Sequence, residues 1–585
     1  MRRKGSPLID KARVLETLAA NPGATKRDLV RLLGVKGSDR IVLKRTLKEM
    51  AADGLIEGNR RRGFLPPGAL PPMAVLEIVG EDRDGDLIAR PARWDFDDEP
   101  PKVFVSPGEG TAPGKGDRIL ARLTRHGEEY DAKIVRRLGA AVGRILAVVR
   151  STASSPRLVP VDRKVKSDFS ADARALGGAE ENELVLIEPL PGRRARVIER
   201  LGSLDAPKSV SLIAIHSYGI PAEFPPEALA EAKAAKPVPL GKRTDLRAIP
   251  LVTIDPDDAR DFDDAVWAGP DPDAKNGFVA VVAIADVAHY VTPGSALDQE
   301  AFKRGNSVYF PDRVVPMLPE ALSNDLCSLN PGADRPCMAV RMHFDAAGKL
   351  RRHAFMRGLM RSAARLTYGQ AQKAFDGVPV DIPDAARKTL AGLWATYRAM
   401  AAARKKRAPL DLDLPERRIV IGDDGKISSI AFKERLESMK LIEEFMVMAN
   451  VAAAETLEKH RMPLIYRVHE EPSKEKLHAF ADYLRTIGMP FAKGQVPTPA
   501  LFNRILETAK GGPYEVTMND LVLRTQAQAI YDTVNIGHFG LDLPKYAHFT
   551  SPIRRYADLS VHRALIRALK FGGDGATEGE IGKLA

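Results

Sequence analysis

The sequence predicts a multidomain α+β protein, in which a small N-terminal helical domain precedes two small β-barrels and a large mixed α/β domain. The chain has 585 residues, more than a single hydrophobic core usually serves. Its hydrophobic pattern also changes along the chain, from helical spacing to short alternating segments and then to long mixed segments. We expect a first domain at 1–70, barrels at 71–140 and 141–205, a linker at 206–240 and the large domain at 241–585.

The first domain is predicted to be a winged helix-turn-helix. Apolar residues recur at helical spacing in three segments, which Pro22-Gly23 and Gly34 separate, and Thr25 is a good N-cap for the second. The segment after the third helix contains three consecutive arginines, at 60–62, and is typical of a small hairpin with a basic tip. This order of elements indicates the winged-helix architecture.

Positive charge is concentrated in this first domain. Residues 1–64 hold 16 Lys and Arg against 7 Asp and Glu, which gives +9 of the net +11 of the whole chain. Arg40, Lys44 and Lys48 recur on one face of the third helix, away from the apolar face of Leu43 and Leu47. Such a face favours contact with nucleic acid. The alternative is a solvated basic helix beside a core.

The next two domains show the pattern of five-stranded OB/cold-shock-like barrels. Short alternating apolar segments are separated by Gly, Pro and Asp turns. These segments are 74–79, 86–89, 103–105, 118–123 and 130–137 in the first barrel, and 141–149, 157–161, 183–190 and 194–199 in the second. Neither barrel has the clustered aromatic residues that stack on bases. A spacer role therefore stands beside direct RNA binding.

The two cysteines, Cys327 and Cys337, match no metal-binding spacing and no disulfide framework, which favours a reducing cytoplasmic compartment. The basic N-terminus lacks the apolar stretch of a signal peptide. The most apolar helical run, 445–454, is too short to span a membrane. We expect a cytoplasmic protein with no membrane partner.

The strongest chemical signal is an acidic cluster between two apolar segments that are predicted to be strands. Six carboxylates fall within residues 255–264. Like charges at this density favour neutralisation by cations, and hard oxygen ligands select Mg²⁺, Mn²⁺ or Ca²⁺. Two such ions are a common device for phosphodiester hydrolysis. The alternatives are a solvated acidic turn, a structural Ca²⁺ loop and a charge cluster at a helix N-terminus, although the EF-hand spacing is missing.

The sequence resembles the RNase II/RNase R (RNB) family in five blocks that occur in the family's order. The blocks are Ile254-Asp-Pro-Asp-Asp-Ala-Arg-Asp-Phe-Asp-Asp-Ala-Val266, residues 304–319, Leu441-Ile-Glu-Glu-Phe-Met446 with Asn450, residues 466–472, and Gly537-His-Phe-Gly540 with His548-Phe-Thr-Ser-Pro-Ile-Arg-Arg-Tyr556. The helical domain and the two barrels resemble the RNase R arrangement in particular. The resemblance implies an RNB catalytic domain at 241–585.

The resemblance also implies the catalytic residues. The metal ligands would be Asp255, Asp261, Asp263 and Asp264, with Mg²⁺ as the cofactor and Mn²⁺ as an alternative. Asp263 and Arg554 would be catalytic, because a guanidinium can hold two phosphate oxygens. In an extended segment Phe262 points into the core while Asp261 and Asp263 point to the other side. Asp257 and Asp258 are expected on the surface.

Further residues are implied in RNA binding: Tyr309, Tyr368, Glu443, Glu444 and Arg555. The tyrosines would contact nucleotides, since stacking tolerates any base. A glutamate would contact ribose hydroxyls, which distinguish RNA from DNA, and Glu444 is preferred over Glu443. Arg555 would contact a neighbouring phosphate, and a structural ion pair is the alternative.

Two departures from the family pattern and one pair of histidines complete the prediction. Leu412 stands where family members often have a phenylalanine that stacks on the 3′-terminal base. The pattern also implies further helices and an S1 domain after Ala585, so we expect a C-terminally truncated form without it. His469 and His538 are expected to be structural rather than general bases.

The predicted function is a processive 3′-to-5′ exoribonuclease that hydrolyses RNA to 5′-nucleoside monophosphates by a two-metal mechanism, in RNA degradation and turnover. Its partner would be single-stranded RNA, or structured RNA with a 3′ overhang, and the protein would be a monomer. One rival is a non-enzymatic RNA-binding regulator with an inactive catalytic domain. The other is a DNA-binding transcription factor fused to a metabolic domain. The complete aspartate set and Arg554 favour the enzyme.

Overall fold

The computed structural model describes residues 10–584 apart from short stretches. The chain folds as two compact units, Met1–Ser209 and Val210–Ala585. The residues outside the description are 1–9, 21–23, 36–38, 53–55, 60–62, 66–69, 71–72, 82–85, 93–99, 107–117, 127–128, 140–144, 152–155, 163, 164, 166, 191, 415, 423–426, 433, 493 and 585.

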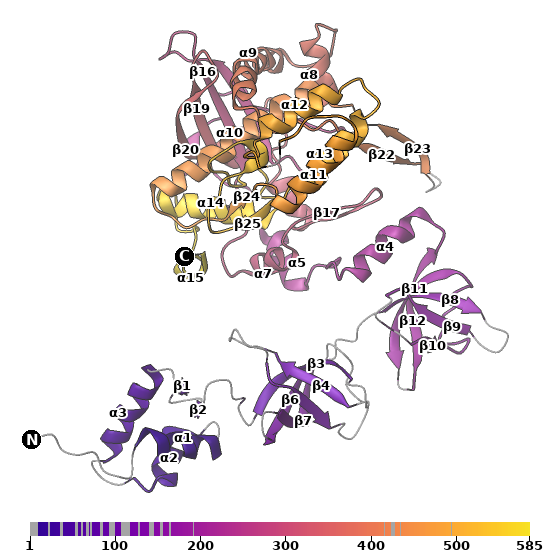
Figure 1. The fold of residues 1–585 in the computed structure, drawn as a ribbon, viewed down its shortest axis with the longest axis vertical. Helices are drawn as coiled ribbons and strands as arrows, with labels where there is room; N and C mark the ends of the chain where they lie inside the picture. Colours follow the sequence, from indigo (N-terminus) through magenta and orange to yellow (C-terminus); the bar gives the residue numbers. More distant parts are fainter. Residues whose placement is uncertain are drawn as a thin grey trace, which may run out of the picture. The chain divides into compact units, whose positions relative to one another are not determined.

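The first elements of the N-terminal unit are three helices and a two-stranded antiparallel hairpin (Figure 1). They are α1 (Lys11–Ala20), α2 (Lys26–Leu32), α3 (Asp39–Ala52), β1 (Glu57–Asn59) and β2 (Gly63–Leu65). Thr25 caps α2 in a capping box with Asp28, as its position predicted. Leu43 and Leu47 on α3 are buried, whereas Lys44 is exposed. The predicted basic tip at 60–62 lies outside the described residues, and the winged helix-turn-helix stays a prediction.

Two closed five-stranded barrels follow, and this part of the predicted fold is confirmed. The first consists of β3 (Met73–Glu81), β4 (Leu87–Pro91), β5 (Val103–Ser106), β6 (Arg118–His126) and β7 (Glu129–Gly139). The second consists of β8 (Ile145–Ser151), β9 (Pro156–Pro160), β10 (Phe169–Ser170), β11 (Glu183–Leu190) and β12 (Arg194–Ser203). The sequence did not predict β10, because two residues are too few to show alternation.

The C-terminal unit is built on a seven-stranded mixed sheet with the order β13-β20-β19-β16-β15-β14-β21. Its strands are β13 (Thr244–Asp245), β14 (Val252–Asp255), β15 (Asp264–Pro270), β16 (Phe278–Ala285), β19 (Asp334–Phe344), β20 (Leu350–Arg361) and β21 (Ala364–Thr367). β14 pairs antiparallel with β15 and parallel with β21. The adjacent ends of β14 and β15 therefore place Asp255 near Asp264.

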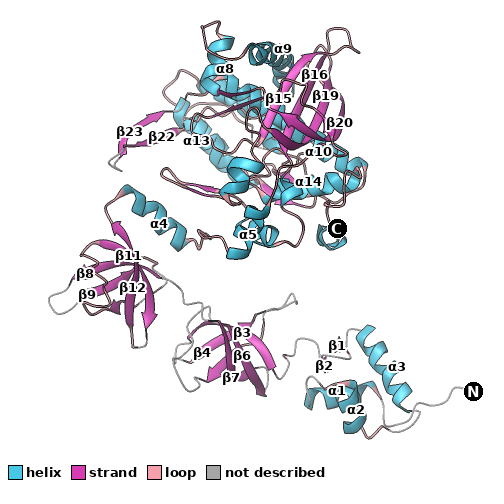
Figure 2. Ribbon diagram, turned by 180° about the vertical axis from the view of Figure 1, so that it is seen from behind, coloured by secondary structure: helices cyan, strands magenta, loops and turns pink. Residues whose placement is uncertain are grey.

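Helices pack on this sheet around one large hydrophobic core (Figure 2). Two long helices, α9 (Asp384–Arg407) and α10 (Glu437–Lys459), contact β15, β16 and β19. The other helices are α6 (Val287–Tyr290), α7 (Ala296–Arg304), the π-helix η1 (Ala321–Leu326), α8 (Tyr368–Phe375), α11 (Lys474–Thr486), α12 (Pro499–Ala509), α13 (Glu515–Thr525), the short 3₁₀ helix η2 (Phe539–Leu541), α14 (Tyr556–Ala568) and α15 (Glu578–Leu584). Three two-stranded pairs complete the unit: β17 (Val308–Tyr309) with β18 (Val314–Val315), β22 (Arg417–Ile421) with β23 (Ile427–Phe432), and β24 (Tyr466–Val468) with β25 (Ile530–Asp532). No described helix is long and apolar enough to cross a membrane.

The predicted linker at 206–240 contains more structure than expected. It holds two helices, α4 (Pro207–Ser217) and α5 (Pro226–Ala234). Ala228 and Ala232 of α5 are buried in the large core. Glu231 accepts hydrogen bonds from the first backbone N–H groups of α7. The second half of the predicted linker is thus an integral part of the C-terminal unit.

Candidate active site

The acidic segment runs from the end of β14 to the start of β15, and one buried side chain fixes its direction. The Phe262 side chain is only 4% exposed. Its backbone N–H donates to Ser328 Oγ at 2.9 Å, and its carbonyl accepts from the N–H of Leu329 at 2.9 Å. Because successive side chains of an extended segment alternate, Asp261 and Asp263 point away from the core side. Asp257 and Asp258 are exposed, as expected.

Asp263 is the most firmly held of the four aspartates. Its side chain is 6% exposed, and Oδ1 accepts a hydrogen bond from the N–H of Ile553 at 2.9 Å. Oδ2 lies 3.9 Å from Nε of Arg554. The acidic segment and the Arg554 segment, almost 300 residues apart in sequence, therefore meet at this carboxylate.

Burial and mutual repulsion make the charged aspartates unfavourable without a cation. Burial, together with the charges of Asp264 and Asp263, raises the pKa of Asp255 to about 8. Burial raises the pKa of Asp264 to about 6 against the opposing effect of Arg554. Burial also raises the pKa of Asp263 and of Asp261. A divalent cation would reverse these shifts, because it favours the ionised form.

An unpartnered oxygen supports the same conclusion. Oδ2 of Asp255 is buried and has no hydrogen-bond partner among the residues that the structure describes. A buried carboxylate oxygen without a partner is costly. A hard cation that prefers carboxylate oxygens would satisfy it. The residues present therefore fit a divalent metal.

A second group of potential metal ligands lies elsewhere on the sheet. One ligand atom each of Asp271, Asp273 and His343 lies within 4.8 Å of the others, a closer grouping than any three of the predicted aspartates form in the described part of the chain. However, Arg352 Nη2 lies 2.7 Å from Asp273 Oδ2 and 3.3 Å from His343 Nδ1. The arginine already supplies positive charge there, so we retain the aspartates at 255–264 as the candidate metal site.

The two predicted arginines have different environments. Arg554 is 43% exposed at its side chain, and its Nη2 donates to Ser551 Oγ at 3.1 Å. Arg555 donates from Nε and Nη2 to the buried carboxylate of Asp558, both at 2.8 Å. For Arg555 the structure thus contains the ion pair that was the alternative to a phosphate contact. Only Nη1 is free of that pair.

The two tyrosines approach the aspartates from separate elements. Tyr309 on β17 is 53% exposed, and its hydroxyl donates to Asp261 Oδ2 at 3.5 Å. Burial and the charge of Asp261 raise the pKa of Tyr309 to about 12. Tyr368 is the first residue of α8 and is half-buried, and its pKa is raised by burial and by the charges of Asp264 and Asp255. Both rings therefore stand beside the acidic segment.

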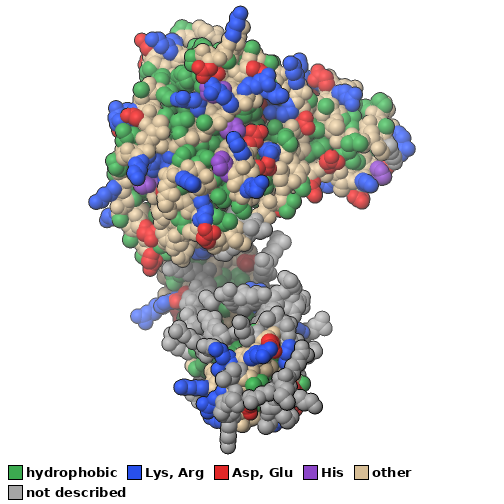
Figure 3. Space-filling model, turned by 90° about the vertical axis from the view of Figure 1, so that its left-hand side faces the viewer, with side chains coloured by type: hydrophobic (Ala, Val, Ile, Leu, Met, Phe, Trp, Pro, Cys, Tyr) green, Lys and Arg blue, Asp and Glu red, His purple; other side chains and the backbone are tan. Residues whose placement is uncertain are grey.

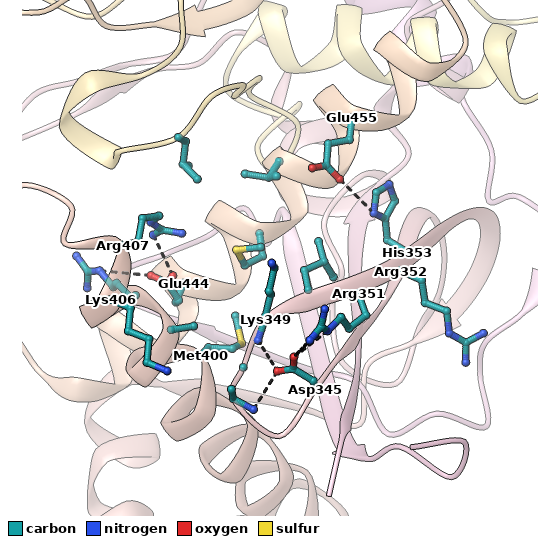
Figure 4. A pocket seen from close by; sticks show the side chains of 18 of the residues that line it. Asp345, Lys349, Arg351, Arg352, His353, Met400, Lys406, Arg407, Glu444 and Glu455 are labelled. Atoms are coloured by element: carbon teal, nitrogen blue, oxygen red, sulfur yellow. Dashed lines mark hydrogen bonds and ion pairs between the residues drawn. The ribbon is translucent and has the colours of Figure 1, made fainter. Parts of the chain in front are cut away.

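The two candidate glutamates on α10 differ in exposure. Glu444 is 2% exposed and forms ion pairs with Arg407 at 3.2 Å and Arg404 at 3.5 Å. Glu443 is more exposed and lies 3.6 Å from both Arg404 and Arg435. Burial raises the pKa of Glu444, which the arginines oppose. Glu444 lines a cavity of about 840 Å³ (Figure 4).

The histidines have structural hydrogen bonds. His469 Nδ1 accepts from the N–H of Gly540 at 2.9 Å, and its Nε2 lies 3.0 Å from the carbonyl of Ala527. His538 Nδ1 accepts from the N–H of Leu541 at 3.2 Å, and burial lowers the pKa of His538 to about 4. These contacts agree with the expectation that neither is a general base. Leu412 packs against a small cluster that includes Phe502.

Sequence reasoning missed the residues that position the acidic segment. Arg365 Nη2 donates to the carbonyls of Asp257 at 3.0 Å and Ala259 at 3.1 Å. Its guanidinium lies 4.7 Å from the centre of the Phe262 ring. Arg365 stands three residues before the predicted site residue Tyr368, and this closeness in sequence was the available signal.

Comparisons with known proteins match two parts of the chain to protein families. Residues 243–570, more than half of the chain, match the RNB domain family, and residues 158–225 match the cold shock domain family. Ribonuclease R of Vibrio cholerae is 36% identical over 96% of this chain and 69% of its own length. Ribonuclease R of Escherichia coli is 34% identical over 96% of this chain and 70% of its own length.

Solved structures show the same relationship. Mycoplasma genitalium RNase R in complex with ribose methylated single-stranded RNA has a TM-score of 0.69 and 28% identity, covering 88% of this chain and 81% of that one. Yeast Ssd1, a pseudonuclease, has a TM-score of 0.57 and 16% identity over 92% of this chain and 72% of that one, which shows the fold alone. The chain spans about 70% of the length of the curated relatives that it matches.

RNB nucleases depend on divalent metals, and carboxylate oxygens such as those of the aspartates at 255–264 are of the kind that such metals prefer. With the family match over more than half of the chain and the identity to ribonuclease R over almost all of it, the chain belongs to the ribonuclease R family of RNB-domain exoribonucleases and is a 3′-to-5′ exoribonuclease.

Proposed function

We propose that this enzyme degrades RNA processively from the 3′ end and releases 5′-nucleoside monophosphates by a two-metal hydrolysis. The observation that carries the proposal is the convergence of the buried Asp263, three partly buried aspartates and Arg554 at the ends of β14 and β15. In this proposal, negative ligands for cations lie next to a positive group for phosphate. Phosphodiester hydrolysis needs both.

Asp255, Asp261, Asp263 and Asp264 would hold the metal, with Mg²⁺ as the expected ion and Mn²⁺ as the alternative. When bound, a pair of such ions supplies a nucleophile at neutral pH and offsets charge on the leaving oxygen. The backbone N–H of Ile553 keeps Asp263 oriented. Ser328 and Arg365 hold the segment that carries Asp261 and Asp263.

The remaining residues would bind the strand. Arg554, whose guanidinium is partly exposed, would contact the scissile phosphate. Tyr309 and Tyr368 would contact the terminal nucleotides, and Glu444 or Glu443 the ribose hydroxyls. Arg555 would reach a neighbouring phosphate only with Nη1, because Asp558 holds its other donors. Contacts with several nucleotides would keep the strand bound between cleavage steps, which gives processivity.

The proposed partner is single-stranded RNA, or structured RNA with a 3′ overhang, bound by a cytoplasmic monomer. RNase R of Mycoplasma genitalium has been solved with single-stranded and with double-stranded RNA, which supports this choice. On the face shown in Figure 3, Lys and Arg side chains are distributed among acidic and hydrophobic ones. The proposed winged helix, with its excess of positive charge, and the barrels would add sequence-independent contacts.

A 5′-labelled oligoribonucleotide incubated with Mg²⁺ tests the proposal. We expect a ladder that shortens from the 3′ end, 5′-nucleoside monophosphates as products, and full degradation of bound strands when an excess of unlabelled RNA is added. Internal cuts would contradict the exonucleolytic direction. Uniform shortening of all strands in the presence of the competitor would contradict processivity.

A further inference from the structure

The cavity beside Glu444 is separate from the predicted metal site. It has a volume of about 840 Å³ and lies between the end of α9, the turn that joins β19 to β20, and α10 (Figure 4). Neither the four aspartates nor Arg554 is among the described residues that line it. Its volume falls in the range of small-molecule sites and is sufficient for a nucleotide.

Positive side chains dominate the polar part of the lining. Seven Lys and Arg residues face three carboxylates in the described lining: Lys349, Arg351, Arg352, Arg404, Lys406, Arg407 and Lys459 against Asp345, Glu444 and Glu455. Arg351 is paired with Asp345, and Arg352 with Asp273. By contrast, the ammonium groups of Lys349, Lys406 and Lys459 have no partner within the described part of the chain, and the three lysines are exposed.

An unpaired donor also lies within the wall of the cavity. Arg407 uses Nη2 for Glu444, but its Nε is buried and has no acceptor among the described residues. A buried guanidinium N–H without a partner is unfavourable, and an anion in the cavity would satisfy it. In Figure 4, Lys406 and Arg407 lie on one side of the cavity and Arg351 and Arg352 on the other.

The rest of the lining is apolar apart from His353. Met400 and Val451 are buried, and Met448, Leu543 and Pro544 also belong to this part of the wall. Methionine side chains are polarisable and adaptable, and they make favourable contacts with aromatic rings. A ligand that fits both parts of the lining combines a flat apolar ring system with a strongly acidic group.

We propose that this cavity binds a nucleotide, with the phosphate near Lys349, Lys406 and Arg407 and the base against Met400, Met448 and Val451. Two sources have this chemistry: a free nucleoside 5′-monophosphate, which is the product of the proposed reaction, and a nucleotide of an RNA strand. The identity of the free nucleotide rests on the proposed function, whereas the site itself does not. Arg407 also forms an ion pair with Glu444, which is proposed to contact the ribose hydroxyls of the RNA. A nucleotide bound in the cavity would therefore change the environment of Glu444.

Calorimetric titration of the whole chain with EDTA present tests this site. EDTA removes the cations that phosphate would need at the aspartates, whereas the lysines of the cavity are unaffected. We expect 5′-AMP to bind, and adenosine and inorganic phosphate to bind at least about tenfold more weakly, because each lacks half of the contacts. A short oligoribonucleotide, which stays intact without metal, is titrated in parallel. Because an oligonucleotide also binds the residues proposed to hold the strand near the metal site, the source is whichever of AMP and the oligonucleotide loses more affinity when Lys349 and Lys406 of the cavity are changed.

Charge-reversal variants locate the binding. Lys349→Glu combined with Lys406→Glu is expected to weaken AMP binding by about tenfold or more. As the matched control, Lys388→Glu combined with Lys405→Glu makes the same change of charge at two exposed lysines of α9 that do not line the cavity, and it should leave binding unchanged. Unaltered thermal melting of all variants shows that they are folded. Equal AMP binding by the double variant and the control, or no AMP binding in EDTA, overturns the proposal and leaves the exonuclease assay unaffected.

Discussion

Among the acidic residues of the segment 255–264, Asp263 combines burial with two fixed contacts. It accepts the N–H of Ile553 and faces the guanidinium of Arg554. Asp257, six residues earlier, is exposed. The two residues have the same chemistry and nearly the same position in sequence. The difference between a candidate metal ligand and a surface acid therefore comes from the folded environment alone.

Asp263→Asn should abolish most of the activity while RNA binding persists. The change removes one negative charge from the metal ligands but keeps the shape and an acceptor for the Ile553 N–H. Losses at metal-supporting residues are about 10- to 100-fold, and a ligand itself should cost more. Turnover of a labelled oligoribonucleotide and its equilibrium binding are measured. Asp257→Asn is the matched control and should retain both. Normal turnover of Asp263→Asn would remove its assigned role.

Glu444 and Glu443 can be distinguished by their response to the ribose. If a glutamate contacts a 2′-hydroxyl, its change to Gln should lower the kcat/KM of the enzyme on RNA by about tenfold or more. The same change should have little effect on a substrate whose 3′-terminal nucleotides are 2′-deoxy. We expect Glu444→Gln to reduce the ratio of kcat/KM on RNA to kcat/KM on the 2′-deoxy substrate. Glu443→Gln should leave this ratio unchanged. The reverse result would assign the ribose contact to Glu443.

At the scale of elements, the helix α10 supports the segment that carries Arg554. Asn450 of α10 is buried, donates from Nδ2 to Tyr546 Oη at 2.9 Å, and accepts with Oδ1 from the N–H of Phe549 at 2.7 Å. The backbone from Tyr546 onward leads directly to Ile553, the partner of Asp263. The helix thereby helps to position Arg554 beside the acidic segment.

Asn450→Ala should destabilise the C-terminal unit by about 1–3 kcal/mol, because it leaves a buried backbone N–H without an acceptor. Denaturant unfolding monitored on the whole chain gives the free energy of unfolding of that unit. Glu455→Gln on the same helix changes only a weak, partly exposed ion pair with His353 and should have little effect. If Asn450→Ala and Glu455→Gln had the same free energy of unfolding, the hydrogen bonds of Asn450 would contribute nothing to the stability of this unit.

The loop that carries the aspartates has its own support. Arg365 on β21 holds two carbonyls of this loop and covers Phe262. Arg365→Met keeps much of the side-chain volume but loses the hydrogen bonds, so we expect activity to fall about 10- to 100-fold, with a higher Mg²⁺ concentration needed for half-maximal rate. Arg365→Lys should recover part of the loss. Arg361→Met, a change at an exposed arginine that pairs with Asp334, is the control.

The features of the site that could be predicted were those that depend on residues close together in the sequence. Alternation around Phe262 predicted which side the aspartates face, and the short alternating segments predicted both barrels. The supporting contacts could not be predicted, since Phe262 meets Ser328 across 66 residues and Asp257 meets Arg365 across 108. The two-residue strand β10 and the helix α4 were missed because their patterns are too short or too weak. Periodicity predicts the side of an element to which a side chain points. The tertiary contacts of that side chain depend instead on how the whole sheet is assembled.

At the scale of the molecule, the candidate active site is assembled entirely within the unit Val210–Ala585 from four distant segments. Residues 255–264, Tyr309, Tyr368 and 553–554 come together only when the sheet and α10 are complete. The cost of concentrating buried acids there is borne by the same core that builds the site. Metal binding should therefore be visible as stability of this unit as well as in its activity.

We expect Mg²⁺ or Mn²⁺ to raise the melting temperature of the C-terminal unit relative to the same protein in EDTA. A ligand that binds only the folded state at 100 times its dissociation constant adds about 2.7 kcal/mol. The sign follows from the buried, mutually repelling carboxylates, whose charge the cation offsets. Calorimetric melting of the whole chain resolves this transition from the rest. Asp255→Asn combined with Asp264→Asn should already be stable in EDTA, because it removes two carboxyl groups whose ionised forms burial disfavours, and should respond little to Mg²⁺. An Asp271→Asn variant should keep the full increase of melting temperature with Mg²⁺. If Asp271→Asn loses this increase and the double variant keeps it, the metal binds at the Asp271, Asp273 and His343 group instead.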